Sequence, residues 1–228
     1  MNHLNLESLD TDGAVRDAAE AVGLDRNAFL RKSALAGGGL VAGGAFFSLL
    51  GPAEAAISSH KSKRNDVKIL NYALTLEFLE SEFYSLAVAN KAYGASPQLQ
   101  RFAEVVAEHE AKHVSFLKGA LGSAAVKKPT FDFGAAVTDP AMYTATAQVL
   151  EDTGVSAYLG QAAHIQQGPI LTAAATILAI EARHASWIRF LNAPAVADTP
   201  APALPAPSTF DKPASERSIL SKAGGFIK

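Results

Sequence analysis

The motif Glu-x-x-His occurs twice in the sequence, at Glu110 and His113 and again at Glu181 and His184. Each copy lies in a long apolar stretch without proline, which predicts a helix. Three residues along an α-helix turn through about 300°, so the glutamate and the histidine of each copy share one face. A carboxylate and an imidazole on one face can bind the same metal ion. The chain is therefore expected to bring two helices together around a pair of ions.

Two more glutamates extend this repeat. Glu77 is followed seven residues later by Tyr84. Glu151 is followed at the same spacing by Tyr158. The order Glu-x6-Tyr and then Glu-x-x-His therefore occurs twice, with offsets of 151 − 77 = 74 and 181 − 110 = 71 residues. Offsets this similar indicate two related helical hairpins.

This order of residues over four expected helices resembles the ferritin-like superfamily of di-iron and di-manganese carboxylate proteins. The flanking residues 76–84, 154–160 and 180–187 are similar to its exported bacterial branch, described as ferritin-like or desiccation-related proteins. The resemblance covers about residues 66–192. It implies an all-α chain folded as a ferritin-like four-helix bundle, in which a long crossover joins two antiparallel hairpins.

Helix start and stop signals agree with that order. The expected helices are residues 67–91, 97–121, 140–165 and 169–192. Ser96 and Asp139 are each followed by proline, which predicts an N-cap with proline at the first helical position. Residues 122–138 have no helical pattern, and their length suits the crossover. We therefore expect the bundle to occupy residues 67–192.

The resemblance implies one set of six metal ligands. They are Glu77, Glu110, His113, Glu151, Glu181 and His184. Helix geometry suggests that Glu110 and Glu181 bridge or nearly bridge the two ions. His113 and Glu77 would then ligate one ion. His184 and Glu151 would ligate the other. Glu80 lies one helical turn after Glu77 and is the alternative ligand from that helix.

Other polar residues near the motif have expected roles beside the ligands. Tyr84 and Tyr158 lie two turns beyond a ligand glutamate, so each can donate a hydrogen bond to a ligand carboxylate across the bundle. The side chains expected to be solvated or at the rim are Glu80, Glu82, Glu104, Glu108 and His109. His164 is expected to cap or cover the end of the third helix.

Burying four ligand carboxylates together requires compensating charge. Each uncompensated buried charge costs several kcal/mol even after relaxation. Two divalent cations would remove that cost, and a mixture of carboxylates with imidazoles suits iron or manganese. The expected cofactors are therefore two divalent metal ions, Fe or Mn.

Composition excludes several other kinds of site. The chain has no cysteine, which rules out a disulfide framework, thiolate catalysis and cysteine-ligated zinc or iron–sulfur clusters. Its 228 residues carry a formal net charge of −2, which gives no reason to expect a nucleic-acid partner. Metal ions, with oxygen or peroxide as reactants, are the expected partners. The sequence is also compatible with a homo-oligomer.

Both termini are expected to lie outside the bundle. Residues 1–55 combine a basic segment, an apolar run and an Ala-Glu-Ala site, which predicts a signal peptide resembling the twin-arginine type. The match is imperfect because Asn27 stands where the second arginine would be. Export would place the protein in the periplasm or envelope of a bacterium, attached to the membrane only if the signal is not cleaved. Residues 56–66 would be a linker, and residues 193–228 a proline-rich tail.

Three functions are compatible with these features. The first is redox chemistry on Fe(II), peroxide or oxygen by a di-metal oxidoreductase that is ferroxidase-like or manganese-catalase-like. The alternative is a non-catalytic envelope protein that protects against stress or desiccation, in which metal is structural. A ferritin-like storage cage is the third, and the sequence offers no specific support for it.

Overall fold

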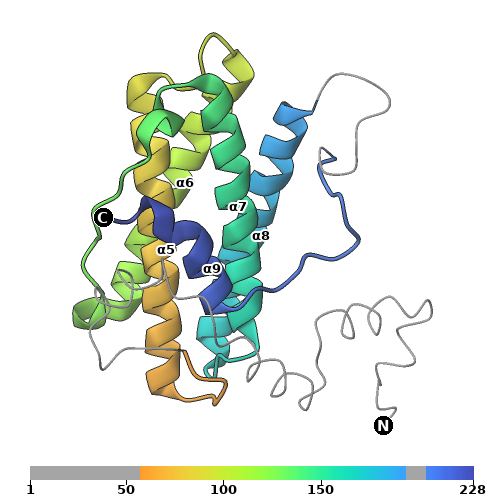
Figure 1. The fold of residues 1–228 in the computed structure, drawn as a ribbon. Helices are drawn as coiled ribbons and strands as arrows, with labels where there is room; N and C mark the ends of the chain where they lie inside the picture. Colours follow the sequence, from red (N-terminus) through yellow and green to blue (C-terminus); the bar gives the residue numbers. More distant parts are fainter. Residues whose placement is uncertain (1–56, 194–203) are drawn as a thin grey trace, which may run out of the picture. The chain divides into compact units, whose positions relative to one another are not determined.

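The structure is a computed structural model and describes residues 57–193 and 204–228. Four long helices make up most of the first range: α5 (Lys63–Asn90), α6 (Pro97–Leu121), α7 (Pro140–Ala162) and α8 (Gly168–Asn192). They run alongside one another, and the two described ranges contain no strand (Figure 1). The predicted all-α class is thereby confirmed. The signal peptide predicted over residues 1–55 lies outside the described residues.

The four helices form two hairpins. α5 packs along α6 and α7 packs along α8, and a short connection joins the helices of each pair. The crossover between the hairpins contains two 3-10 turns, η1 (Gly122–Ala124) and η2 (Gly134–Val137). Phe131 and Phe133 within it are buried, so the crossover packs against the bundle. The ferritin-like four-helix bundle predicted from the sequence is therefore confirmed.

Two of the helix starts follow the predicted capping signals. Ser96 Oγ accepts a hydrogen bond from Leu99 N at 3.3 Å, and Pro97 begins α6. Asp139 Oδ1 accepts one from Met142 N at 2.9 Å at the start of α7. Each cap satisfies a backbone N–H that has no partner inside the helix.

The start of α5 differs from the expectation. The helix begins at Lys63, four residues before the expected Val67 and inside the segment 56–66 that was expected to be a linker. Ser62 is the reason, because its hydroxyl accepts a hydrogen bond from Asn65 N at 3.1 Å and so caps the helix earlier. Sequence reasoning passed over this serine because the apolar pattern begins only after it.

The buried carboxylate of Asp66, in the first turn of α5, holds the connection between α7 and α8. Asp66 Oδ1 accepts a hydrogen bond from Gln166 N at 2.8 Å, and Oδ2 accepts one from Gln167 N at 3.0 Å. The first hairpin is thereby tied to the turn of the second. α7 ends at Ala162, slightly before the expected residue 165, and this connection follows it.

The C-terminal residues return to the bundle. A short helix, α9 (Glu216–Ala223), buries Ile219 and Leu220 and packs on α7 (Figure 1). Lys228 N then donates to Thr130 O at 3.0 Å, which joins the chain end to the crossover. The proline-rich tail predicted over residues 193–228 therefore ends in a docked helix. Residues 194–203 of that tail lie outside the described residues.

Close backbone contact holds the segment before α9. Ala214 N donates to Ser156 O of α7 at 2.9 Å. A Cβ atom at Gly160 would lie 1.9 Å from the carbonyl oxygen of Ala214. Only glycine leaves room for this approach, so the sequence of α7 is adapted to the returning tail.

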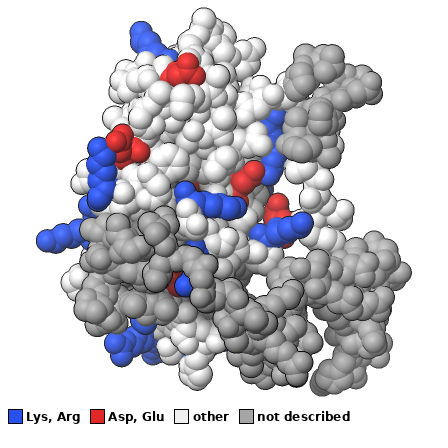
Figure 2. Space-filling model, viewed as in Figure 1, with Lys and Arg blue, Asp and Glu red and all other residues white. Residues whose placement is uncertain are grey.

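The described surface carries acidic and basic side chains intermixed rather than separated by sign, on the face that Figure 2 shows. Ion pairs of the described residues include Lys128 with Glu82 and Lys228 with Asp132. Within the described ranges, none of the helices has the length and apolar character needed to cross a membrane.

Candidate metal centre

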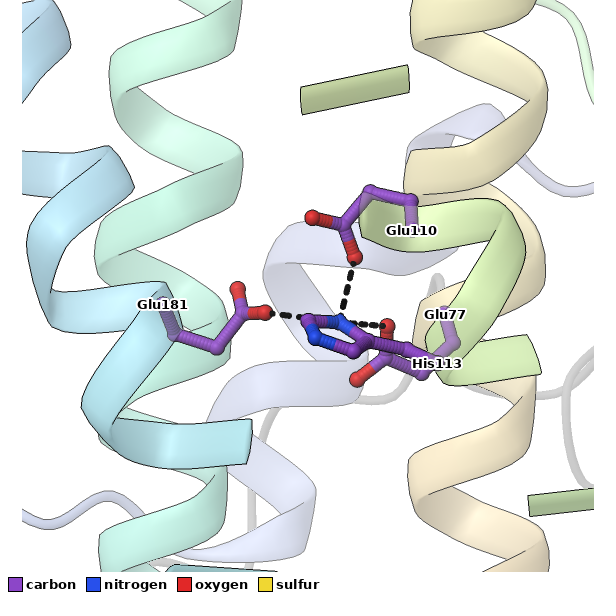
Figure 3. Close-up of side chains that lie close together, drawn as sticks. All are labelled: Glu77, Glu110, His113 and Glu181. Carbon is purple, nitrogen blue, oxygen red and sulfur yellow. Dashed lines mark hydrogen bonds and ion pairs between the residues drawn. The ribbon is translucent and has the colours of Figure 1, made fainter. Parts of the chain in front are cut away.

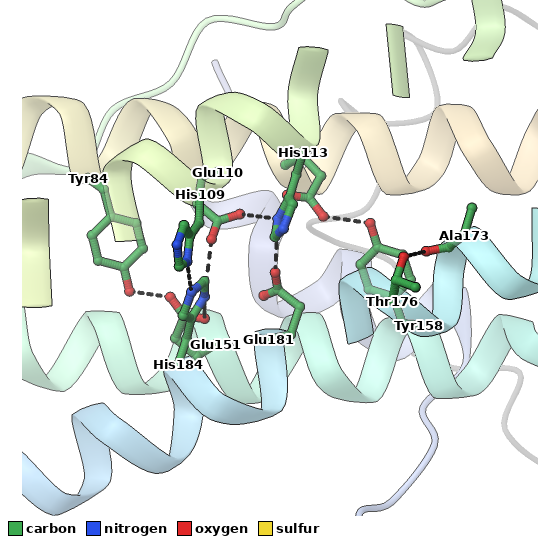
Figure 4. Close-up of polar contacts among 11 residues, drawn as sticks. Tyr84, His109, Glu110, His113, Glu151, Tyr158, Ala173, Thr176, Glu181 and His184 are labelled. Atoms are coloured by element: carbon green, nitrogen blue, oxygen red, sulfur yellow. Dashed lines mark hydrogen bonds and ion pairs between the residues drawn. The ribbon is translucent and has the colours of Figure 1, made fainter. Parts of the chain in front are cut away.

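The six expected ligands point into one space between the four helices (Figures 3 and 4). They are Glu77 on α5, Glu110 and His113 on α6, Glu151 on α7, and Glu181 and His184 on α8. All four glutamates are fully buried and His184 is 2% exposed, whereas His113 is partly exposed. Side chains that lie up to 107 residues apart (184 − 77) therefore meet in one interior.

Their ligand-type atoms form two overlapping groups, each with all atoms within 4.8 Å of one another. The first group is Glu77, Glu110, His113 and Glu181, and the second is Glu110, Glu151, Glu181 and His184. Glu110 and Glu181 belong to both groups. Two neighbouring ions bridged by two glutamates would need this sharing.

The first group converges on one nitrogen. His113 Nδ1 lies 3.0 Å from Glu110 Oε2 and 3.2 Å from Glu77 Oε2. It also lies 3.2 Å from Glu181 Oε1, on the opposite hairpin (Figure 3). Three helices thus supply oxygen atoms around a single imidazole nitrogen.

The second group repeats this geometry on the other side of Glu110. His184 Nδ1 lies 3.2 Å from Glu110 Oε1 and 3.3 Å from Glu151 Oε2. Glu110 therefore turns one carboxylate oxygen toward each histidine. That is how a bridging carboxylate would be placed between two ions.

Each tyrosine of the repeat reaches across to the opposite hairpin (Figure 4). Tyr84, on α5, donates a hydrogen bond to Glu151 Oε1 on α7. Tyr158, on α7, donates one to Glu77 Oε1 on α5 at 2.5 Å. The exchange is reciprocal, and it orients the two outer glutamates so that their second oxygen atoms face the histidines.

Glu80 departs from the sequence-based expectation. It was expected to be solvated or at the rim, but it is only 3% exposed. Gly154 on α7 leaves the room, because a Cβ there would lie 3.0 Å from Glu181 Oε2 and 3.3 Å from Glu80 Oε1. Glu80 is therefore a fifth buried carboxylate beside the cluster, although it belongs to neither ligand group. The sequence did contain a signal for the burial of Glu80. Glu77 and Glu80 have the same spacing as the Glu-x-x-His motifs, so they share one helix face.

His109 lies at the rim, as expected, but it also makes a contact that sequence reasoning missed. Its Nδ1 lies 2.9 Å from His184 Nε2. The two rings are stacked, with centroids 5.1 Å apart and planes 21° apart. No sequence pattern signals this contact, because it joins two helices that lie 75 residues apart in the chain.

The remaining residues expected at the surface stay away from the cluster. Glu82 pairs with Lys128, Glu104 accepts from Gln100 at 2.8 Å, and Glu108 pairs with Lys112 at 2.5 Å. His164 lies just beyond the last residue of α7. None of these four side chains belongs to either ligand group of the described residues.

Without metal, the two histidines of the cluster take up positive charge. Burial by itself lowers the pKa of His113, but the carboxylates of Glu110, Glu181 and Glu77 outweigh it and raise the pKa to about 12. Burial likewise opposes protonation of His184, yet Glu110 and Glu151 raise its pKa to about 10. Imidazolium groups therefore supply part of the compensating charge that cations would supply.

The carboxylates share the remaining protons unevenly. Burial, reinforced by the charge of Glu110, raises the pKa of Glu77 to about 8. Burial and the charge of Glu110 likewise raise the pKa of Glu181, and burial with the charge of Glu181 raises that of Glu80. Burial would also raise the pKa of Glu110, but its hydrogen bond with His113 and its close contact with His184 prevail and lower the pKa to about 2. Glu110 thus stays ionised between the histidines.

The donor atoms fit divalent cations. Several buried atoms of the cluster have no hydrogen-bond partner: Glu110 Oε1, Glu151 Oε2, both Oε atoms of Glu181, and His184 Nδ1. Glu110 Oε1 and Glu151 Oε2 lie at ion-pair distances from His184 Nδ1, and Glu181 Oε1 lies at an ion-pair distance from His113 Nδ1, but none of these contacts is a hydrogen bond. Buried polar atoms are normally satisfied, so their number here calls for a ligand. A divalent ion in each of the two ligand groups would accept the lone pairs of these atoms.

Comparison with known proteins agrees with this geometry. A family model described as a ferritin-like domain matches residues 65–193, which is more than half of the chain. The matched range begins in the first turn of α5 and ends just after α8, so it contains the whole cluster. No curated protein matches the chain.

Proposed function

We propose that this chain, which belongs to the ferritin-like domain family, holds two divalent ions of iron or manganese and uses them in redox chemistry on Fe(II), peroxide or oxygen. One observation carries the proposal. Glu110 and Glu181 belong to both ligand groups, and a histidine Nδ1 faces inward on either side of Glu110. This arrangement has the donor set and the connectivity for two adjacent ions.

Each residue has a definite part in the proposed centre. Glu110 and Glu181 would bridge the ions. His113 and Glu77 would complete one position, and His184 and Glu151 the other. A bound pair of redox-active ions supplies electron transfer to or from the small reactant.

The surrounding side chains hold the ligands and limit access of water. Tyr84 and Tyr158 orient the outer glutamates through their hydrogen bonds. Fully buried Phe83, Phe102 and Tyr143 pack around Tyr84, so that end of the cluster is closed by aromatic rings. His113 is the partly exposed member of the six, so a small reactant would reach the cluster beside it.

Metal analysis of the full chain tests the proposal. The protein is purified from cells grown with iron and manganese, beside the double variant His113→Ala/His184→Ala. About two ions per chain, lost in the double variant, is the expected result. Glu104→Gln is the matched control, because this exposed side chain accepts a hydrogen bond from Gln100 away from the cluster and should leave the metal content unchanged. A wild-type chain that takes up neither metal under these conditions would refute the proposal.

Turnover separates the redox function from the non-catalytic alternative. The metal-loaded protein is assayed for Fe(II) oxidation with oxygen and for consumption of peroxide. Activity that disappears in the double variant supports the redox function. A fully loaded protein that is inactive in both assays would instead favour an envelope protein in which metal is structural.

We also propose that the protein is exported. Support comes only from the order of basic segment, apolar run and Ala-Glu-Ala over residues 1–55. Fractionation of bacterial cells, followed by N-terminal sequencing of the mature protein, tests this. A mature chain that begins near residue 56 in the periplasmic fraction is expected, and an intact chain confined to the cytoplasm would contradict it.

A further inference from the structure

The two ligand histidines have different surroundings, although their motifs are alike. His184 Nε2 faces a protein partner, His109 Nδ1, at 2.9 Å. His113 is 12% exposed, and among the described residues no hydrogen bond to its Nε2 occurs. The imidazole of His184 is therefore in contact with a second protein side chain through its outer nitrogen, whereas the imidazole of His113 is not (Figure 4).

The contact with His109 determines which nitrogen of His184 can bind an ion. His184 Nδ1 is the atom turned toward Glu110 and Glu151, so its lone pair must be free. Its Nε2 must then carry the hydrogen, and His109 Nδ1 lies at hydrogen-bond distance to accept it. A metal-binding imidazole usually donates its other N–H to a protein acceptor, which fixes the ring and strengthens the ligand.

The internal repeat shows that this support exists on one side only. In the first copy the residue before the motif glutamate is His109, and in the second copy it is Ile180. Because the hairpins are related, Ile180 holds the place from which a second acceptor would reach His113. An aliphatic side chain has no hydrogen-bond acceptor. The difference between the two histidine surroundings therefore follows from the sequence, which has His109 in one copy and Ile180 in the other.

We propose that His109 is a positioning residue: it accepts the Nε2–H of His184, directs the Nδ1 lone pair into the cluster, and makes the two ion positions unequal. The position bounded by Glu151 and His184 is the tighter one. The position at Glu77 and His113, which borders solvent, is the exchangeable one. This inference rests on the proposed function, since it presupposes that the cluster binds two ions.

Stepwise binding of Mn²⁺ tests the inference, with the free ion measured by electron paramagnetic resonance. The wild-type full chain is expected to bind two ions in two distinguishable steps. His109→Ala should weaken the tighter step about 10- to 100-fold and leave the weaker step nearly unchanged. His109→Asn should restore most of the loss, because its Oδ1 can take the place of the lost Nδ1 acceptor.

Two further variants sharpen the design. Glu108→Gln is the matched control, since this exposed neighbour of His109 pairs with Lys112 and lies in neither ligand group, so both steps should stay unchanged. Ile180→His adds an acceptor on the other side and should tighten the weaker step. In Zn²⁺-loaded protein labelled with ¹⁵N, the histidine spectrum should show His184 protonated at Nε2 in the wild type, a signature that general packing would not produce.

The failures of the two proposals are distinguishable. Two bound ions with an unchanged tighter step in His109→Ala would overturn this inference and leave the proposed function standing. Equal weakening of both steps, or no recovery in His109→Asn, would also overturn it, because a general structural effect would then be responsible. A wild-type chain that binds neither Mn²⁺ nor, without oxygen, Fe²⁺ would overturn both. Circular dichroism of the metal-free variants establishes that each one is folded.

Discussion

Tyr158 Oη donates a hydrogen bond to Glu77 Oε1 at 2.5 Å, across 81 residues of sequence and between the two hairpins. Tyr84 makes the reciprocal bond to Glu151. The two hairpins are therefore joined at their centre by the residues that also position the outer glutamates. Stability and the geometry of the candidate centre depend on the same contacts.

Tyr158→Phe should destabilise the metal-free protein by about 1–3 kcal/mol, because it leaves a buried carboxylate oxygen of Glu77 without its donor. Urea denaturation measures the free energy of unfolding. Tyr143→Phe is the matched control, since the hydroxyl of Tyr143 is buried without a hydrogen-bond partner. Its removal should cost little or nothing, and an equal loss in both variants would assign the effect to packing.

Gly154→Ala should weaken metal binding. The new methyl group would lie 3.0 Å from Glu181 Oε2 and 3.3 Å from Glu80 Oε1, so both carboxylates would have to shift. Gly119→Ala on α6 is the control, because a Cβ there meets nothing within 4 Å. That control should stabilise its helix by up to about 1 kcal/mol and leave the metal content unchanged. Normal metal content in Gly154→Ala would show that Glu181 tolerates displacement.

The metal-free protein should lose stability as the pH rises above about 6.5. His113 and His184 have folded-state pKa values of about 12 and about 10, above their ordinary value of 6.5, so the folded state binds more protons. Their stabilising contribution is complete below pH 6.5 and declines as the pH rises toward the folded-state pKa values. Glu77, raised to about 8, acts in the same direction from pH 4.5 upward.

Glu110 acts in the opposite direction at low pH. Its lowered pKa, about 2, gives a contribution that is present above pH 4.5 and lost as the pH falls toward 2. Thermal unfolding at a series of pH values measures both effects. Saturating metal should reduce the loss above pH 6.5, because ions replace the protons of the cluster and bind better as the pH rises. A metal-free protein equally stable at pH 6 and pH 9 would contradict the assigned protonation states.

Gly160→Ala should release the C-terminal segment from α7. A Cβ atom would lie 1.9 Å from the carbonyl oxygen of Ala214, which is backbone and can move only if the segment moves with it. Hydrogen exchange should then be faster over α9, whose Ile219 and Leu220 lose their burial. Gly119→Ala serves again as the control. Unchanged protection of α9 would mean that the segment is held mainly by its contacts with the crossover.

The sequence by itself determined the class of fold and the kind of site. Helix periodicity and capping are local, so the four long helices and the starts at Ser96 and Asp139 could be predicted from spacing alone. The Glu-x-x-His spacing is equally local, because three residues along one helix always share a face. The repeat of Glu-x6-Tyr then indicated two related hairpins, and with them the candidate ligands and their order.

Only the tertiary structure decided what lies between the helices. Burial of Glu80 depends on Gly154, a residue of another helix, and the contact of His109 with His184 depends on how α6 and α8 are rotated against each other. The return of α9 depends on the close approach of Ala214 to Gly160. Such contacts join residues far apart in the chain and are set by packing distance and helix rotation, and no spacing along a single helix contains that information.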